Sequence, residues 1–102
     1  MEFALLNRLT AKPGQREGVV EILLESGKLF DENPACRLYL VAESEDDPNL
    51  IWVADLWTSE VEHAKALEVP EMRPFVEECM PLLEGMPEQI RVLPAGGKVP
   101  RG

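Results

Sequence analysis

The strands predicted from this sequence are apolar on both faces. In residues 3–9, 38–41 and 50–57, apolar side chains fill nearly every position, whereas a strand with one face in water alternates apolar and polar residues. The predicted helices are sufficient to cover only one face of such a sheet. The other face would expose an apolar patch larger than the few hundred Å² that soluble monomers tolerate. We therefore expect a second copy of the same sheet to cover it.

Hydrophobic periodicity and turn residues predict the element order β-α-β-β-α-β. The strands are expected at residues 3–11, 36–43, 50–57 and 88–93, and the helical segments at residues 15–30, 59–67 and 72–83. Thr58 or Ser59 caps the second helix, with Glu62 three residues after Ser59 as a capping box, and Pro81 kinks or ends the third helical piece. This order is that of a ferredoxin-like subunit, in which the crossovers place the helices on one face of an antiparallel sheet. The predicted fold class is therefore α+β.

The length of 102 residues fits one domain with one core. We expect this domain at residues 1–94 and a flexible tail at residues 95–102, because the last nine residues (PAGGKVPRG) are rich in proline and glycine. No apolar run approaches the roughly 18 residues of a membrane span. The first residues lack the basic start and apolar stretch of a secretion signal. We therefore expect a cytoplasmic protein with no membrane partner.

The formal net charge is −9, from 19 acidic and 10 basic residues. Such a charge opposes phosphate backbones, so we expect no nucleic-acid partner. The two cysteines, Cys36 and Cys79, have no CxxC spacing, and one histidine accompanies them. Because a zinc site needs about four clustered ligands, we expect no metal site and interpret both thiols as buried small apolar groups.

Five segments, in their order and spacing, carry a resemblance to a known family. They are residues 7–14 (NRLTAKPG), 36–39 (CRLY), 46–48 (DDP), 56–60 (LWTSE) and 72–75 (MRPF). Over about residues 3–94 the chain resembles the antibiotic biosynthesis monooxygenase (ABM) domain, a family of dimeric α/β barrels. Its members include cofactor-independent quinone-forming monooxygenases and haem-degrading enzymes. The resemblance implies a homodimer with one small-molecule cavity per subunit, between the sheet and the helices.

The chain departs from this family at two positions. Family members often carry a histidine nine residues after the tryptophan that ends the third strand, where haem-degrading members carry a second tryptophan; this chain has Ala66. Haem-degrading members also carry a histidine near the position of Val76. Of the three residues typical of haem degradation only Asn7 remains, so we expect no haem and no other cofactor.

Asn7 is the candidate catalytic residue, because it is polar in the middle of an apolar strand. A buried amide without partners costs about 1–3 kcal/mol, so its hydrogen bonds must be satisfied. The functional interpretation is a donor that holds a substrate oxygen or an oxygen derived from O2, and the family places asparagine here. The alternative is a structural hydrogen bond to a neighbouring loop.

Four aromatic side chains, Tyr39, Trp52, Trp57 and Phe75, are the candidate substrate-binding residues. Trp57 is either an aromatic wall with an indole donor or a core anchor, and Trp52 lines either the cavity or the dimer barrel. Tyr39 either donates to a substrate oxygen or lies at a rim, satisfied by water. His63 has the pKa of a general base, but it falls at a different helical angle from the family histidine. We therefore expect a solvated surface histidine there.

The resemblance leads to three functional hypotheses. The first is a cofactor-independent monooxygenase that acts on a small aromatic substrate, a phenol or hydroquinone whose anion reacts with O2 in an apolar cavity. The second is a non-catalytic small-ligand-binding or stress-related dimer of the same fold. The third is an isomerase or lactone-processing enzyme on this scaffold. Oxygen uptake with a panel of hydroquinones distinguishes the first hypothesis from the other two.

Overall fold

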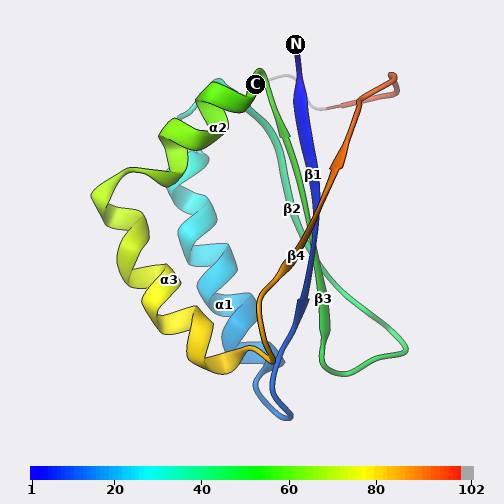
Figure 1. The fold of residues 1–102 in the computed structure, drawn as a ribbon, viewed down its shortest axis with the longest axis vertical. Helices are drawn as coiled ribbons and strands as arrows, with labels where there is room; N and C mark the ends of the chain where they lie inside the picture. The colour runs from blue at the N-terminus through cyan, green and yellow to red at the C-terminus, as the bar shows by residue number, and fades with distance from the viewer. Residues whose placement is uncertain (100–102) are drawn as a thin grey trace.

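The computed structural model describes residues 1–99 and contains a four-stranded antiparallel sheet (Figure 1). The strands are β1 (Phe3–Thr10), β2 (Cys36–Glu43), β3 (Leu50–Trp57) and β4 (Glu88–Val92), and their order in the sheet is β2-β3-β1-β4. The predicted bounds of β2 and β3 are confirmed to the residue, and β1 and β4 each end one residue earlier than predicted. The ferredoxin-like α+β fold is confirmed.

The helical segments also follow the sequence prediction, with 3-10 turns at their ends. They are α1 (Arg16–Gly27), η1 (Lys28–Phe30), α2 (Glu60–Leu67), η2 (Pro70–Met72), α3 (Arg73–Cys79) and η3 (Met80–Leu82). The Ser59 hydroxyl accepts the Glu62 amide N–H at 3.2 Å, as the capping box predicts. Pro81 lies in η3, where α3 has ended, because proline cannot donate to a helical ladder.

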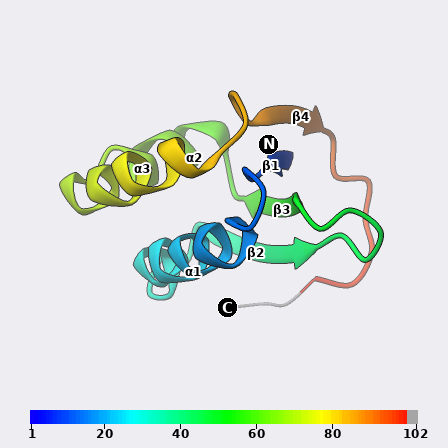
Figure 2. The ribbon, with the colours of Figure 1, turned by 90° about the horizontal axis from the view of Figure 1, so that it is seen from below.

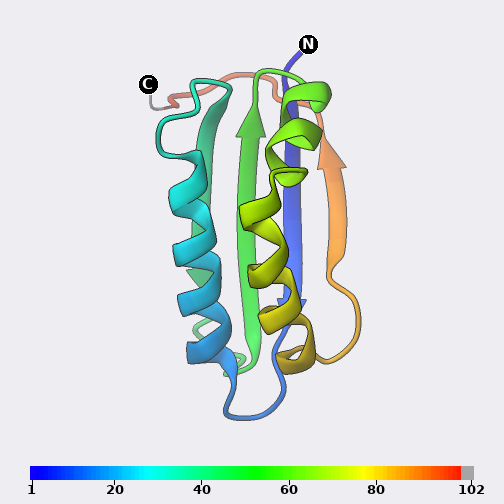
Figure 3. The ribbon, with the colours of Figure 1, turned by 90° about the vertical axis from the view of Figure 1, so that its left-hand side faces the viewer.

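The helices cover one face of the sheet and leave the other bare. Figure 3 shows α1 in front of β2 and α3 in front of the central strands β3 and β1, and Figure 2 shows both helices lying on one side of the sheet. Two apolar clusters fill the space between the layers. One gathers around Phe3, Phe30 and Trp57, and the other gathers around Val19, Ile51 and Leu83. This layering places the inward side chains of four strands opposite the helices.

The bare face of the sheet is apolar and partly exposed. A row across all four strands consists of Ile90, Leu6, Ala54 and Leu40, since each is the register partner of the next. Leu6, Leu40 and Ile90 are 39%, 53% and 46% exposed, and Trp52 on the same face is 38% exposed. A patch that spans the whole sheet is the kind that soluble proteins cover with a partner.

The residues after β4 turn back along one end of the sheet. Pro94–Gly97 and Val99 have no regular secondary structure and line a pocket together with Glu2, Arg37 and Leu56. The last three residues of the predicted tail, 100–102, lie outside the described residues. Within residues 1–99, no helix combines the length and the apolar character needed to cross a bilayer.

Candidate functional site

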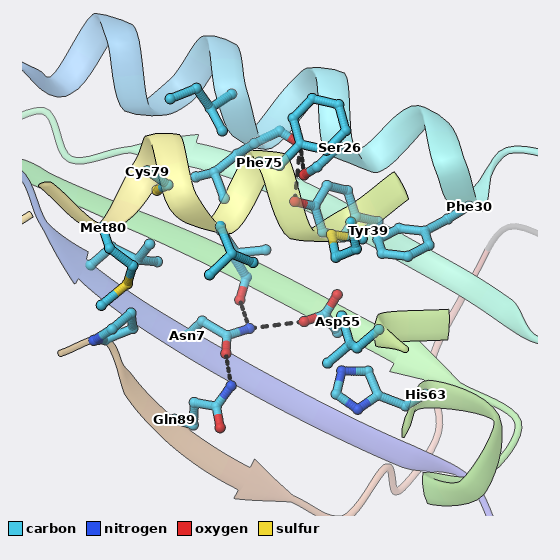
Figure 4. A pocket seen from close by; sticks show the side chains of 18 of the residues that line it. Asn7, Ser26, Phe30, Tyr39, Asp55, His63, Phe75, Cys79, Met80 and Gln89 are labelled. Carbon is cyan, nitrogen blue, oxygen red and sulfur yellow. Dashed lines mark hydrogen bonds between the residues drawn. The ribbon is translucent and has the colours of Figure 1, made fainter. Parts of the chain in front are cut away.

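A cavity of about 250 Å³ lies between the sheet and the helices, where the two apolar clusters meet. An engineered apolar cavity of about 150 Å³ binds benzene, so this one has room for a substituted benzene or a two-ring aromatic. Most of its lining is apolar. The polar lining residues are Asn7, Ser26, Tyr39, Asp55, His63 and Gln89 (Figure 4).

Asn7 is the centre of a hydrogen-bonded chain that crosses three strands. Its amide nitrogen donates to the Asp55 carboxylate at 2.8 Å and to the Val53 carbonyl at 3.0 Å, and its amide oxygen accepts from Gln89 Nε2 at 3.2 Å. The register explains these partners, because Asn7 lies opposite Val53 on β3 and opposite Gln89 on β4. Both amide hydrogens of Asn7 are therefore in use, and its partners lie on strands rather than on a neighbouring loop.

Asp55 is the only carboxylate that lines the cavity, and no lysine or arginine lines it among residues 1–99. The side chain is buried, at 8% exposure. Burial raises its pKa above the ordinary 3.8, while the Asn7 hydrogen bond, the charge of His63 and the nearby Trp57 indole act to lower it. The Asn7 contact is its only hydrogen bond of ordinary geometry within the described residues. Most of the accepting capacity of this carboxylate is thus unused.

His63 lines the cavity, so the expectation of a solvated surface histidine is wrong. Its ring packs against Phe3 and Trp57, with centroids 5.1 and 5.3 Å apart. Burial lowers its pKa from 6.5, and the charges of Asp55 and Glu60 act in the opposite direction. The imidazole is therefore mainly neutral near pH 7.

Trp57 is a core anchor and also lines the cavity. Its side chain is fully buried, and its ring packs edge-on against Phe30 at 5.0 Å and 84°. The indole N–H has no hydrogen-bond partner of ordinary geometry in the described part of the chain, although it lies close enough to Asp55 to affect that carboxyl. A buried donor without a partner is costly, and a ligand oxygen in the cavity would satisfy it.

The remaining aromatic candidates divide between the two faces of the sheet. Tyr39 on β2 and Phe75 on α3 line the cavity. The Tyr39 hydroxyl donates to the Leu23 carbonyl of α1 at 3.1 Å, and burial raises its pKa to about 12. Trp52 lies on the opposite face and is not part of the cavity lining. Its position favours the second of its two interpretations, which is the dimer barrel.

Gly27 allows α1 to pass directly over the Tyr39 ring. A Cβ at Gly27 would lie 2.6 Å from Tyr39 Cε2, whereas a Cβ at Gly18 on the same helix would meet Leu82 Cδ1 at an ordinary 3.6 Å. We expect the free energy of unfolding of Gly27→Ala to be about 1–3 kcal/mol lower than that of Gly18→Ala, because the added methyl group would displace the Tyr39 ring. Urea denaturation of both variants checks this. Equal stability of the two would contradict the close approach.

This chain has small or aliphatic side chains at the two positions where the family resemblance implies haem-binding side chains in haem-degrading members. Ala66 is buried, Val76 lines the cavity, and His63 packs against two aromatic rings. We expect haemin titration to give no Soret band typical of a His-ligated iron, and no haem breakdown when a reductant is added. A tight stoichiometric complex that is lost in His63→Leu would contradict this expectation.

Comparisons with known proteins identify the family and agree with the fold. The family model described as antibiotic biosynthesis monooxygenase (ABM) matches residues 2–78. The chain is similar to the structure of a proposed antibiotic biosynthesis monooxygenase from Chloroflexus aurantiacus. That pair has 30% sequence identity and a TM-score of 0.85 over 96% of this chain and 97% of the other. No curated protein matches the sequence.

Two more distant structures show the same fold. SnoaB from Streptomyces nogalater, a cofactor-independent oxygenase, is 18% identical, with a TM-score of 0.81 over 94% of this chain and 95% of the other. A proposed antibiotic biosynthesis monooxygenase from Nitrosomonas europaea is 14% identical, with a TM-score of 0.84 over 99% and 94%. At these identities the two likenesses concern the fold alone.

Proposed function

Because this chain belongs to the antibiotic biosynthesis monooxygenase family, we propose that it is a cofactor-independent monooxygenase that oxidises a small phenol or hydroquinone with O2. The observation that carries the proposal is the apolar cavity of about 250 Å³, into which a small set of polar groups converges. The similar fold of SnoaB, a cofactor-independent oxygenase, supports it.

The reaction requires an ionised substrate and a dry cavity. A phenol with a free ring position loses two hydrogens and gains one oxygen atom to give a quinone, while the second atom of O2 leaves as water. The electron-rich substrate anion supplies the electrons, so the protein contributes binding, water exclusion and a place for the proton. Aromatic walls at Tyr39, Trp57 and Phe75 would hold the ring, and the unpaired Trp57 N–H would donate to an oxygen.

Asn7 is proposed to act on the reacting centre from the middle of this lining. In the structure both of its amide hydrogens are occupied, so holding an oxygen directly requires the substrate to replace one of these acceptors. Asn7 also orients the Asp55 carboxylate at 2.8 Å. Either route makes turnover depend on this amide.

A non-catalytic small-ligand-binding dimer is the second candidate function. The occupied amide of Asn7 favours it, because a satisfied hydrogen-bond network stabilises a cavity without taking part in chemistry. Under this alternative the cavity binds aromatic ligands, but O2 is not consumed.

The bare face of the sheet supports a homodimer. Leu6, Leu40, Trp52 and Ile90 would be buried against the same face of a second copy, and a self-complementary patch is the usual basis of two-fold dimers. The two sheets would then form the dimeric α/β barrel of the family. We propose a permanent interface that buries more than about 2,000 Å² in total.

Aerobic turnover with oxygen-uptake recording tests the proposed function. The panel consists of neutral monohydric phenols, benzohydroquinones and naphthohydroquinones, each compared with a protein-free sample to subtract autoxidation. We expect uptake that is proportional to protein concentration for at least one two-ring substrate. Ligand binding without any uptake above the protein-free rate would favour the binding module instead.

A further inference from the structure

Among residues 1–99 the cavity is lined by one carboxylate, that of Asp55, and by no lysine or arginine. Asp55 is 8% exposed, it accepts one hydrogen bond of ordinary geometry with the Trp57 indole nearby, and it makes no ion pair within residues 1–99. Its one partner, Asn7, donates to Oδ2 at 2.8 Å and fixes the orientation of the carboxylate. The lining around it is otherwise mainly apolar (Figure 4). A buried carboxylate with unused lone pairs requires a donor from a ligand or from water.

We infer that Asp55 is the acceptor of the substrate hydroxyl, and that it restricts the cavity to phenols without a negative charge. On binding, the hydroxyl donates a hydrogen bond to the carboxylate. In the reaction the substrate O–H bond breaks, the proton bonds to a carboxylate oxygen of Asp55, and the electron pair remains on the substrate oxygen. That proton leaves with the water formed from the second oxygen atom. The inference rests on the proposed monooxygenase function.

Burial makes Asp55 a better base than an exposed aspartate. A phenolic hydroxyl has a pKa near 10, far above that of an ordinary carboxyl, and proton transfer becomes easier as this gap narrows. The raised pKa of Asp55 narrows the gap. His63 also lines the cavity, but in this assignment it is not the acceptor, because Asn7 holds the Asp55 carboxylate in a fixed orientation at 2.8 Å and no hydrogen bond within residues 1–99 orients the imidazole.

Charge selection follows from the same side chain. A substrate that carries its own carboxylate would bring a second negative charge next to the buried Asp55 carboxylate, and like charges at short range disfavour the ionised form of both groups. In the part of the chain that the structure describes, no lysine or arginine lines the cavity to offset this cost. We expect a naphthohydroquinone to bind about tenfold or more tightly than its carboxylate-bearing analogue.

Several titratable groups near Asp55 could contribute to the pH dependence of kcat/KM. His63 of α2 lowers its pKa, while Cys36 and Tyr39 of β2 interact with it and have raised pKa values of their own. Asn7 of β1 and Trp57 of β3 are the neutral neighbours. Because the cysteine and tyrosine titrate at high pH, an acidic limb of the kcat/KM profile belongs to Asp55 or to His63.

Binding under argon and turnover in air test the inference with matched variants. Isothermal titration uses the naphthohydroquinone and its carboxylate-bearing analogue on the wild type, Asp55→Asn and Glu60→Gln. Glu60 is an exposed carboxylate next to His63, paired with Arg91 outside the cavity. We expect Asp55→Asn to lose the preference for the neutral ligand by gaining affinity for the analogue, and Glu60→Gln to keep the preference. In air, kcat/KM of Asp55→Asn should fall about 100-fold or more.

The pH profile separates Asp55 from His63. We expect activity to fall as pH decreases through the raised pKa of Asp55, since the base must be ionised. Asp55→Asn should remove this acidic limb, and His63→Leu should move it to higher pH because a charge that lowers the Asp55 pKa is gone. A limb that disappears in His63→Leu and persists in Asp55→Asn would overturn the assignment.

Asp55→Asn should remain folded, so these comparisons are measurable. The folded state binds the Asp55 proton more tightly than the unfolded state, because the folded pKa lies above 3.8. The free energy of unfolding therefore falls as pH rises from the unfolded-state pKa of Asp55 to its higher folded-state pKa. At pH 7 the ionised carboxylate lowers stability, and we expect Asp55→Asn to melt at an equal or higher temperature.

The outcomes distinguish this inference from the proposed function. If no substrate drives oxygen uptake but the charge preference is present and disappears in Asp55→Asn, the monooxygenase proposal fails and the acceptor role in binding stands. If oxygen is consumed while Asp55→Asn retains both the charge preference and the acidic limb, the function stands and the inference is wrong.

Discussion

Replacing Asn7 by alanine should lower turnover per folded dimer by about 10²–10³-fold. If Asn7 holds the reacting oxygen, the loss of one such donor costs about 2.7–4 kcal/mol of transition-state stabilisation. If it acts through Asp55, the carboxylate loses the hydrogen bond that orients it toward the substrate hydroxyl. The measurement is kcat/KM by oxygen uptake, normalised to dimer that sediments and melts as the parent does.

Two variants control this experiment. Gln89→Ala removes the neighbour that donates to the Asn7 oxygen at 3.2 Å but leaves the Asp55 contact in place, so it should retain most of the activity. Trp57→Phe retains an aromatic wall and removes the unpaired indole N–H. If Asn7→Ala instead loses about 1–3 kcal/mol of stability and keeps full activity per dimer, the amide is structural and the binding module becomes the better interpretation.

Replacing Leu6 by aspartate should convert the proposed dimer to monomer at micromolar concentration. Leu6 lies in the middle of the row that crosses the bare face, between Ile90 and Ala54. Two-fold symmetry places the new carboxylate in the interface twice, and each unpaired buried charge costs several kcal/mol. We expect the dissociation constant to rise by about 10³-fold or more. Sedimentation equilibrium measures this change.

Val61→Asp is the matched control for assembly. Val61 is 62% exposed on α2, and α2 lies on the helical side of the sheet. This variant introduces the same charge and should remain dimeric. A wild-type protein that sediments at 11.4 kDa with native circular dichroism would contradict the dimer itself.

The sequence predicts the strands well, because their composition is distinctive. Residues 36–43 and 50–57 are nearly continuous apolar runs between turn signals, and both were located to the residue. The same property hides the orientation of their side chains. When both faces of a strand are apolar, the alternation of residue types does not reveal which of the two side chains, Trp52 or Trp57, points toward the helices. Only the packed structure shows this.

To predict the orientation of His63 from sequence, one must know which face of its helix is apolar, and α2 is only eight residues long. Over so short a segment the apolar stripe is weakly defined. Ala66 and Leu67, three and four residues after His63, face the core and the cavity. Residues three and four positions apart share one face of a helix, so this spacing indicates that the imidazole also faces the cavity.

The hydrogen-bonded chain through Asn7 depends on contacts between distant residues. Gln89 is 82 positions away in sequence and Asp55 is 48 away, and sheet register brings them together. The sequence shows that Asn7 needs partners but not which ones. Asp55 is a lone carboxylate in an apolar strand, so it indicates a second functional residue in the same way as Asn7 does. A buried charge without an ion partner is unusual in a merely structural role.

Isotopically labelled dioxygen tests the central claim most directly. The purified wild type is given a two-ring phenol or hydroquinone from the panel under labelled O2, with no added cofactor or metal, and the quinone product is analysed by mass spectrometry. We predict one labelled oxygen atom per product, one O2 consumed per turnover and no accumulation of hydrogen peroxide. Unlabelled quinone formed together with hydrogen peroxide, at the protein-free rate, would contradict the monooxygenase function.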